Sequence, residues 1–263
     1  MMGTMGLSSR LDSVSRTTLV LLVLPATAVA LSSCALFRVL RGAPRVKLDS
    51  VYWTFARIAL RVGGTRLEAH GLENVQPGQG YVVVSNHESN WDPLALIAAF
   101  RGVPLRFVVK REISDIPIFG WAVIRTGSVR VERTGEQSDV DRIRERMGTR
   151  PPDTSMLFYA EGKRSRDGAL HPFKKGAFAT AIAYRLPVLP VGHAGCYRIW
   201  QPLVFGLRSG PVVVEVGRPI PAEHLGYEDR EKLRDQTFDA VSELRSRARR
   251  RIRELGVEPG GID

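Results

Sequence analysis

The sequence predicts an α/β protein: an αβα sandwich with a largely parallel or mixed central sheet, preceded by an N-terminal membrane-associated helical segment. Two observations lead to this fold class. After residue 64, short runs rich in valine and isoleucine alternate with helical patterns, as in folds whose helices cover both faces of a sheet. Before residue 64, positions 17–37 form a stretch of 21 residues without a charge, which is long enough to cross a bilayer as a helix.

The expected elements follow these patterns along the chain. Strands are expected at 80–86, 105–110, 127–132, 154–160, 187–193 and 211–217, and helices at 93–101, 114–125, 136–148, 175–185 and 222–255. The strand at 187–193 contains Pro187 and Pro190, and prolines place a strand at a sheet edge or mark a strand end. We find no internal repeat and no long low-complexity segment.

The apolar N-terminal stretch is compatible with either a retained membrane anchor or a signal peptide that is removed. Basic residues flank it on both sides, so its orientation stays open. A removed signal peptide has the same basic and apolar parts, and Leu31-Ser32-Ser33-Cys34 looks like a bacterial lipoprotein cleavage box. We favour a retained anchor, because residues 48–63 alternate apolar side chains with Arg57 and Arg61, as an interfacial helix does. A helix packed on the core would show the same pattern.

Composition limits the classes of partner. The 263 residues have a net charge of +11, which favours an anionic partner: nucleic acid, a phosphorylated metabolite or an acidic membrane surface. Two cysteines, Cys34 and Cys196, cannot build a disulfide framework, so a reducing compartment is the simpler assumption. One side of the last helix is basic, with Arg245, Arg247, Arg249, Arg250, Arg251 and Arg253. This side is either solvated or bound to anionic lipid headgroups.

An imidazole and a carboxylate stand five residues apart where the first predicted strand ends. They are His87 and Asp92, in the segment Asn-His-Glu-Ser-Asn-Trp-Asp-Pro at 86–93. If the chain turns there, Asp92 fixes the tautomer of His87, and the opposite ring nitrogen can take a proton from a hydroxyl. Asp92 and Pro93 also suit a helix start. A zinc site is disfavoured because Trp91 stands where a second histidine is required.

A second polar cluster follows the strand expected at 154–160. Gly162 permits a tight turn of the backbone, and Glu161 suits a hydrogen bond from a substrate hydroxyl. Arg164 suits a phosphate, as do Lys163 and Arg166. A solvated loop is the alternative. A Walker loop is excluded because no glycine stands five residues before Gly162.

Between these clusters, Lys110 ends a predicted strand and precedes an apolar run at 116–121. Lys110 suits a second contact to a phosphate or to the thioester side of a donor. The apolar run suits either a groove for an alkyl chain or packing in the core. Arg130 and Arg133 add positive charge after the next strand.

In this order, the blocks resemble the glycerophospholipid acyltransferase family, most closely the bacterial 1-acylglycerol-3-phosphate (lysophosphatidate) acyltransferases. Its four blocks match Asn86-His87-x-Ser89-x-x-Asp92; Lys110 with 117–120 and Arg133; Glu161-Gly162-x-Arg164-Ser165 with 172–176; and 188–191. The resemblance covers residues 65–220. Tyr159-Ala160 stands where Phe-Pro is usual, and Lys163 where threonine is usual, so acceptor selectivity stays open.

The resemblance implies transfer of a fatty acyl group from an acyl thioester to the free hydroxyl of lysophosphatidate, giving phosphatidate. Acyl-CoA or acyl-carrier protein is the implied donor, and no metal or other cofactor is implied. His87 is the implied general base and Asp92 its partner. The implied substrate contacts are Glu161, Gly162, Arg164, Lys110 and Arg133, with Ser89 or a backbone N–H at the oxyanion.

Other functions fit parts of the same pattern. The blocks do not distinguish lysophosphatidate from glycerol 3-phosphate, another lysophospholipid or an acylated amino-acid lipid. A non-catalytic membrane lipid-binding protein is an alternative from another class. Nucleic-acid binding has no support beyond charge, and no Gly-x-Ser-x-Gly elbow of a serine hydrolase is present.

We expect three segments: an anchor with an interfacial helix at 1–64, an acyltransferase domain at 65–220 and a basic amphipathic helix at 221–263. We expect the protein at the bacterial inner membrane, with its catalytic domain on the cytoplasmic face.

Overall fold

The computed structural model describes residues 7–43, 45–132, 137–201 and 206–262. At its centre lies a seven-stranded sheet in the order β1-β7-β6-β2-β5-β3-β4. The strands are β1 (Thr65–His70), β2 (Val82–Ser85), β3 (Leu105–Lys110), β4 (Val129–Val131), β5 (Ser155–Tyr159), β6 (Val188–Ala194) and β7 (Gly210–Val216). Neighbouring strands are parallel except for β6 and β7, which are antiparallel.

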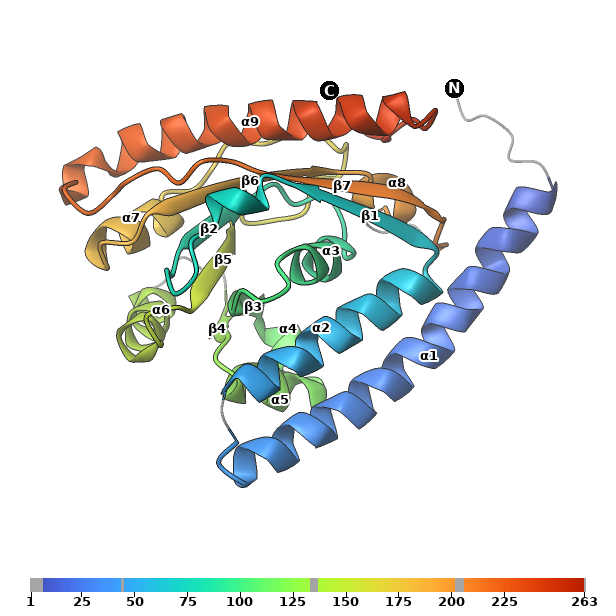
Figure 1. Ribbon diagram of the computed structural model, residues 1–263, viewed down its shortest axis with the longest axis horizontal. Helices are drawn as coiled ribbons and strands as arrows, with labels where there is room; N and C mark the ends of the chain where they lie inside the picture. Colours follow the sequence, from blue (N-terminus) through green and yellow to red (C-terminus); the bar gives the residue numbers. More distant parts are fainter. Residues whose placement is uncertain (1–6, 44, 133–136, 202–205, 263) are drawn as a thin grey trace.

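Helices cover both faces of this sheet, with α2 and α3 on one face and α9 on the other (Figure 1). Alternate residues of β2 serve the two faces: Val83 packs in one core with Leu96 of α3, and Val82 packs in the other with Phe178 of α7. The αβα prediction is therefore confirmed. The helices are α1 (Leu7–Leu40), α2 (Arg45–Val62), α3 (Asp92–Ala99), α4 (Arg111–Ser114), α5 (Phe119–Arg125), α6 (Gln137–Thr149), α7 (Gly176–Ala183), α8 (Cys196–Ile199) and α9 (Arg230–Glu254), with short 3-10 turns at Leu72–Asn74 and Tyr227–Asp229.

Several elements differ from the expectation, three of them for clear physical reasons. Strand β1 was not predicted, because it is a polar edge strand whose side chains are half-buried or exposed. The helix expected at 114–125 is two helices, α4 and α5, separated around Pro117, since a proline disfavours helical backbone in the residue before it. The last helix begins at Arg230 rather than at 222, after a 3-10 turn.

The basic side of α9 is not uniformly exposed, so that part of the expectation was wrong. Arg245 and Arg249 are each only 4% exposed. Arg245 donates hydrogen bonds to the carbonyls of Gly168 and Ile262, and Arg249 donates to the carbonyl of Gly260. These two arginines fasten the C-terminal segment and the loop after β5 to the helix. A buried arginine must find such partners, because an unpaired buried charge is costly.

Helix α1 lies beside α2 and α5 (Figure 1). Val20 and Ala35 are buried against the rest of the protein, and the Thr17 hydroxyl accepts a hydrogen bond from the N–H of Leu207 (2.8 Å). Within the described residues, 13–40 make up a helix that is long and apolar enough to cross a membrane, judged by length and composition. The division of the chain into the segments 1–64, 65–220 and 221–263 stays a prediction.

Candidate active site

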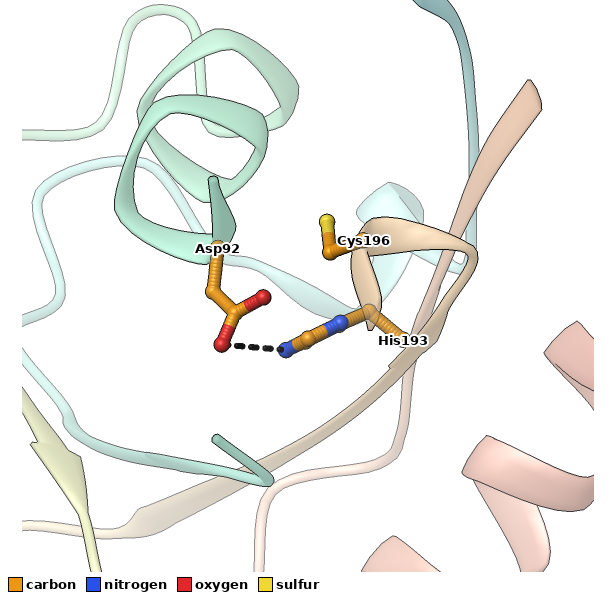
Figure 2. A group of neighbouring side chains, drawn as sticks. All are labelled: Asp92, His193 and Cys196. Atoms are coloured by element: carbon orange, nitrogen blue, oxygen red, sulfur yellow. Dashed lines mark ion pairs between the residues drawn. The ribbon is translucent and has the colours of Figure 1, made fainter. Parts of the chain in front are cut away.

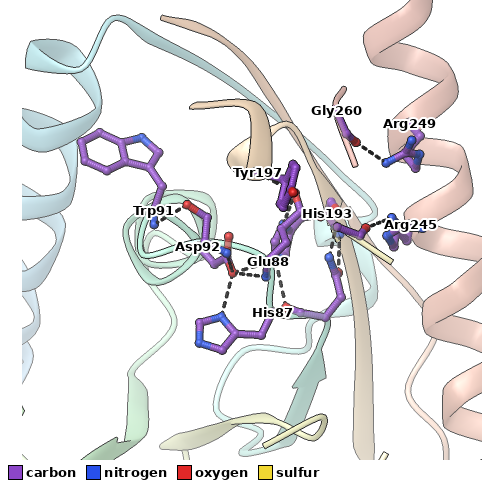
Figure 3. Close-up of polar contacts among 12 residues, drawn as sticks. His87, Glu88, Trp91, Asp92, His193, Tyr197, Arg245, Arg249 and Gly260 are labelled. Atoms are coloured by element: carbon purple, nitrogen blue, oxygen red, sulfur yellow. Dashed lines mark hydrogen bonds and ion pairs between the residues drawn. The ribbon is translucent and has the colours of Figure 1, made fainter. Parts of the chain in front are cut away.

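The loop between β2 and α3 brings the predicted pair together. His87 follows the end of β2, Asp92 is the first residue of α3, and the loop turns so that His87 Nδ1 lies 2.8 Å from Asp92 Oδ2 (Figure 3). Asp92 is fully buried, and the side chain of His87 is 10% exposed. The pair lies at the carboxyl ends of parallel strands, where open α/β sheets place their ligand sites.

Backbone N–H groups orient the Asp92 carboxylate. Its Oδ2 accepts hydrogen bonds from the N–H groups of Glu88 (2.7 Å) and Ser89 (2.9 Å). Asp92 was expected to cap α3, but its side chain instead binds the loop that precedes the helix. Burial favours the neutral acid, yet the imidazoles of His193 and His87 and the Ser89 N–H outweigh it and lower the pKa of Asp92. An ionised Asp92 accepts from Nδ1–H of His87, so that Nε2 is the nitrogen suited to accept a proton.

Tyr159, at the end of β5, covers one face of the His87 ring. The two ring centroids are 3.9 Å apart, and the planes are inclined by 11°. The hydroxyl is buried and has no hydrogen-bond partner among the described residues. Burial and the charge of Asp92 raise the pKa of Tyr159 well above its ordinary value, so the hydroxyl stays protonated. Stacking restricts the imidazole to one orientation relative to Asp92.

The second polar cluster lies directly against the first. Glu161 is 5% exposed, and its two oxygens accept from the N–H groups of His87 (2.7 Å) and His171 (3.0 Å). Burial raises the pKa of Glu161 to about 7, against the effect of these two hydrogen bonds. The Arg164 guanidinium donates to Asn90 Oδ1 in the loop that contains His87.

Gly162 makes the turn that allows this contact. Its φ is +77°, and a Cβ at this position would lie 2.8 Å from Cε of Lys174. Only glycine adopts such backbone without strain. The structure thus brings Glu161, Gly162 and Arg164 to the loop of His87.

Three other predicted residues have different surroundings. The buried Ser89 hydroxyl donates to the carbonyl of Trp200 (2.7 Å) and accepts from the N–H of Trp91 (3.0 Å). Lys110 forms an ion pair with Glu112 at the surface (3.1 Å). Arg133 lies outside the described residues. The substrate contacts expected of these three stay predictions.

A buried layer behind the pair was not predicted. Asn86 and His193 exchange two hydrogen bonds of 3.0 Å between the Asn86 amide and the His193 backbone. His193 Nε2 lies 3.9 Å from Asp92 Oδ2, and His193 Nδ1 lies 3.9 Å from Glu88 Oε1. Burial and the charge of Asp92 raise the pKa of Glu88 to about 8, and burial lowers that of His193. Burial therefore favours the neutral form of both side chains.

One group of side chains in the described part of the chain has the spacing of metal ligands. The donor atoms of Asp92, His193 and Cys196 lie within 4.8 Å of one another (Figure 2). However, Asp92 Oδ2 is bound by His87, and His193 Nε2 lies 3.0 Å from the carbonyl of Asn86. Burial raises the pKa of the Cys196 thiol well above its ordinary value, whereas metals bind the thiolate. We interpret the group as the buried lining of the pair.

Comparisons with known proteins bear on this geometry. The model of the Acyltransferase family matches residues 66–194. A 1-acyl-sn-glycerol-3-phosphate acyltransferase of Pseudomonas aeruginosa is 30% identical over 200 residues, covering 75% of this chain and 71% of that protein. The chain belongs to the acyltransferase family. The expected family is thereby confirmed.

Two further relatives show how far the likeness extends. A chloroplastic 1-acyl-sn-glycerol-3-phosphate acyltransferase of Brassica napus is 36% identical over 157 residues, which cover 59% of this chain but 45% of the Brassica protein. The chain therefore spans less than half the length of this plant relative. The crystal structure of the 1-acyl-sn-glycerophosphate (LPA) acyltransferase PlsC of Thermotoga maritima has the same fold. Its TM-score is 0.78 at 21% identity, over 95% of this chain and 98% of that one.

Proposed function

We propose that this protein is a 1-acyl-sn-glycerol-3-phosphate acyltransferase, which moves a fatty acyl group from a thioester to the free hydroxyl of lysophosphatidate and forms phosphatidate. The observation that supports the chemistry is the 2.8 Å contact between His87 Nδ1 and the buried Asp92 Oδ2. Membership of the acyltransferase family supports the reaction class. The names of the relatives support the acceptor.

The proposed reaction is a single displacement. His87 Nε2 takes the proton of the acceptor hydroxyl while its oxygen attacks the carbonyl carbon of acyl-CoA or acyl-carrier protein. The new C–O bond forms, the C–S bond breaks, and the departing thiolate receives the proton from the imidazolium. Asp92 stabilises the imidazolium between these steps through its ionised Oδ2. The acyl group is never bonded to the protein, and His87 and Asp92 act without a metal.

The second cluster is our proposed site for the glycerol phosphate. Arg164 offers a planar guanidinium suited to phosphate oxygens, and Gly162 permits the turn that holds it beside the His87 loop. Glu161 orders this region through its two backbone hydrogen bonds. Lys110 and Arg133 are further candidate contacts. The Ser89 hydrogen is donated to the carbonyl of Trp200, so we assign the oxyanion to a backbone N–H.

The apolar helix at 13–40 indicates membrane association. We propose that the protein acts on the cytoplasmic face of a bacterial inner membrane, with residues 1–64 as anchor and interfacial helix. Acyl thioesters are cytoplasmic donors, and neither Cys34 nor Cys196 is in a disulfide, as suits a reducing compartment. Residues 65–220 would form the catalytic domain, and 221–263 a helical segment packed on it.

An acceptor panel tests this function. Purified protein in detergent is given labelled acyl-CoA or acyl-carrier protein, with lysophosphatidate, glycerol 3-phosphate, other lysophospholipids or acylated amino-acid lipids. We expect labelled phosphatidate from lysophosphatidate. Transfer only to another acceptor would keep the chemistry and replace the substrate. Absence of transfer across the panel with both donors would refute the proposal and favour a non-catalytic lipid-binding protein.

A further inference from the structure

Exposed large apolar side chains gather on one side of the protein. Of the sixteen in the described residues, eleven lie in α1 or between positions 113 and 121. These are Val14, Leu19, Leu21, Leu22, Val29, Phe37, Leu40, Ile113, Ile116, Ile118 and Trp121. Helices α1 and α5 lie next to each other, and α9 lies on the opposite side of the sheet (Figure 1). A soluble surface rarely concentrates such residues in one place unless it has a partner.

The part of this surface outside α1 is made of Ile113, Ile116, Ile118 and Trp121, which we call the α4–α5 surface. These side chains are 41%, 43%, 40% and 46% exposed. The sequence had suggested that 116–121 lines an alkyl groove or packs in the core, yet these apolar side chains face outward. Contact between water and four such apolar side chains is unfavourable, because burial of apolar surface is a main source of stability.

The backbone of this surface is also unusual. Ile118 has a φ of +62°, a conformation that a β-branched residue rarely adopts. Such strain persists mainly at functional positions. Nearby, the Arg125 guanidinium lies over the Trp121 ring, 5.0 Å from its centroid. A tryptophan beside a cation suits the boundary between lipid tails and headgroups.

The α4–α5 surface is continuous with the membrane-associated part of the chain. Phe119 of α5 packs on Phe55 of α2 (6.1 Å between ring centroids). Ala122 and Val123 of α5 line an apolar pocket together with Leu31 and other residues of α1. A bilayer that contacts the outer side of α1 therefore also lies close to α5.

We propose that the α4–α5 surface is a second membrane contact, which enters the interfacial region of an anionic bilayer beside α1. The role of this contact rests on the proposed function, because a membrane-bound acceptor must reach the site of His87. Helix α4 directly follows β3, and the carboxyl ends of β3 and β2 lie at the same end of the sheet. Insertion there would bring the carboxyl ends of these strands, where His87 lies, toward the lipid. The +11 charge of the chain favours an anionic leaflet.

Site-specific fluorescence tests this contact. In a Cys34→Ser background, an NBD label is placed on Ile116→Cys or, as a matched control, on Leu255→Cys at the end of α9, which is 42% exposed in the native protein. Each full-length protein is reconstituted in vesicles of phosphatidylethanolamine and phosphatidylglycerol, with or without brominated acyl chains. We expect a blue shift and quenching by bromine at position 116 and neither at position 255.

Three results would overturn the proposal. A label at 116 that stays in an aqueous environment means that no bilayer covers the surface. A blue shift without quenching by bromine means that protein covers it, such as a second copy of this chain. A quenched label at 255 instead of 116 means that α9 faces the lipid.

Turnover separates this inference from the proposed function. The double variant Ile113→Ser, Ile116→Ser is compared with Leu255→Ser on lysophosphatidate dispersed in detergent and on the same lipid in vesicles. We expect the double variant to lose about tenfold in rate on vesicles and less than twofold in detergent. Equal loss in both formats would show a structural role and overturn the proposal. The fluorescence result stands whether or not the acceptor is lysophosphatidate.

Discussion

Replacing Asp92 by asparagine tests the assigned base with a minimal change in shape. In the native protein, one oxygen, Oδ2, accepts from His87 Nδ1 and from the N–H groups of Glu88 and Ser89. Because all three partners are donors, the amide oxygen of an asparagine must take this place and its NH2 group must take that of Oδ1. The hydrogen bond to His87 then survives, and the negative charge is lost.

The magnitude follows from that charge. Two unit charges 2.8 Å apart attract by about 6 kcal/mol at an effective dielectric constant near 20. A retained neutral hydrogen bond returns about 1–1.5 kcal/mol, which leaves a loss of roughly 4–5 kcal/mol when His87 becomes an imidazolium. We therefore expect kcat/KM to fall by about 10^3- to 10^4-fold.

The assay is initial-rate transfer of labelled acyl groups to lysophosphatidate at several acceptor concentrations. Circular dichroism and thermal unfolding of the same preparation check that the variant is folded. Asp141→Asn, an exposed carboxylate on α6, is the matched control and is expected to change the rate by less than twofold. A loss below tenfold for Asp92→Asn would refute the argument that this carboxylate supports the base.

Changes at three further positions test the surroundings of the pair. Glu88→Gln should be more stable than wild type by an amount that grows from pH 5 and levels off above pH 8 at roughly 3–5 kcal/mol. The reason is that the pKa of Glu88 is about 8 in the folded protein, against an ordinary value of 4.5. The free energy of unfolding of the wild type therefore falls as the pH rises between these two values, whereas glutamine has no proton to lose. A stability difference between the two proteins that does not change with pH, measured by thermal unfolding, would contradict this. Tyr159→Phe keeps the ring on His87 and removes a buried hydroxyl without a partner, so unfolding should cost about 1 kcal/mol more with kcat/KM within threefold. Tyr159→Leu should lose up to about tenfold in kcat/KM; equal rates for the two variants would argue against positioning by stacking. In Gly162→Ala, the alanine must adopt a φ of +77° with its Cβ close to Lys174, which strains the loop. KM for the acceptor should therefore rise about tenfold, with little change in KM for the donor. An unchanged KM for the acceptor would show that this loop does not bind the phosphate.

The regular parts of the fold could be predicted because their burial leaves a pattern. Residues 82–84 serve two cores in alternation, and such buried valines are recognisable as a strand. Strand β1 has no such run, because it lies at the edge of the sheet with polar side chains. Its place depends on pairing with β7, from which it is distant in the sequence.

The residues of the site could be predicted only where they are close in the sequence or belong to a motif that resembles one of the family's four blocks. His87 and Asp92 stand five residues apart, and their contact needs one turn of the loop. Asn86 and His193 are 107 residues apart, so nothing in local spacing indicates that they meet. Glu161 was expected at a substrate hydroxyl, which stays a prediction; the contacts of its oxygens with the N–H groups of His87 and His171 could not be read from the sequence. Local chemistry suggests what a side chain can do, but tertiary contacts decide which atoms it meets.

The most direct test of the account compares His87→Ala with His224→Ala, a change to an exposed histidine. Phosphatidate formed from labelled acyl-CoA and lysophosphatidate is measured for both variants and for wild type. We predict that His87→Ala loses at least about 10^3-fold in kcat/KM, as expected when a general base is removed, and that His224→Ala retains the wild-type rate. Phosphatidate formation by folded His87→Ala at a rate near that of wild type would contradict the account.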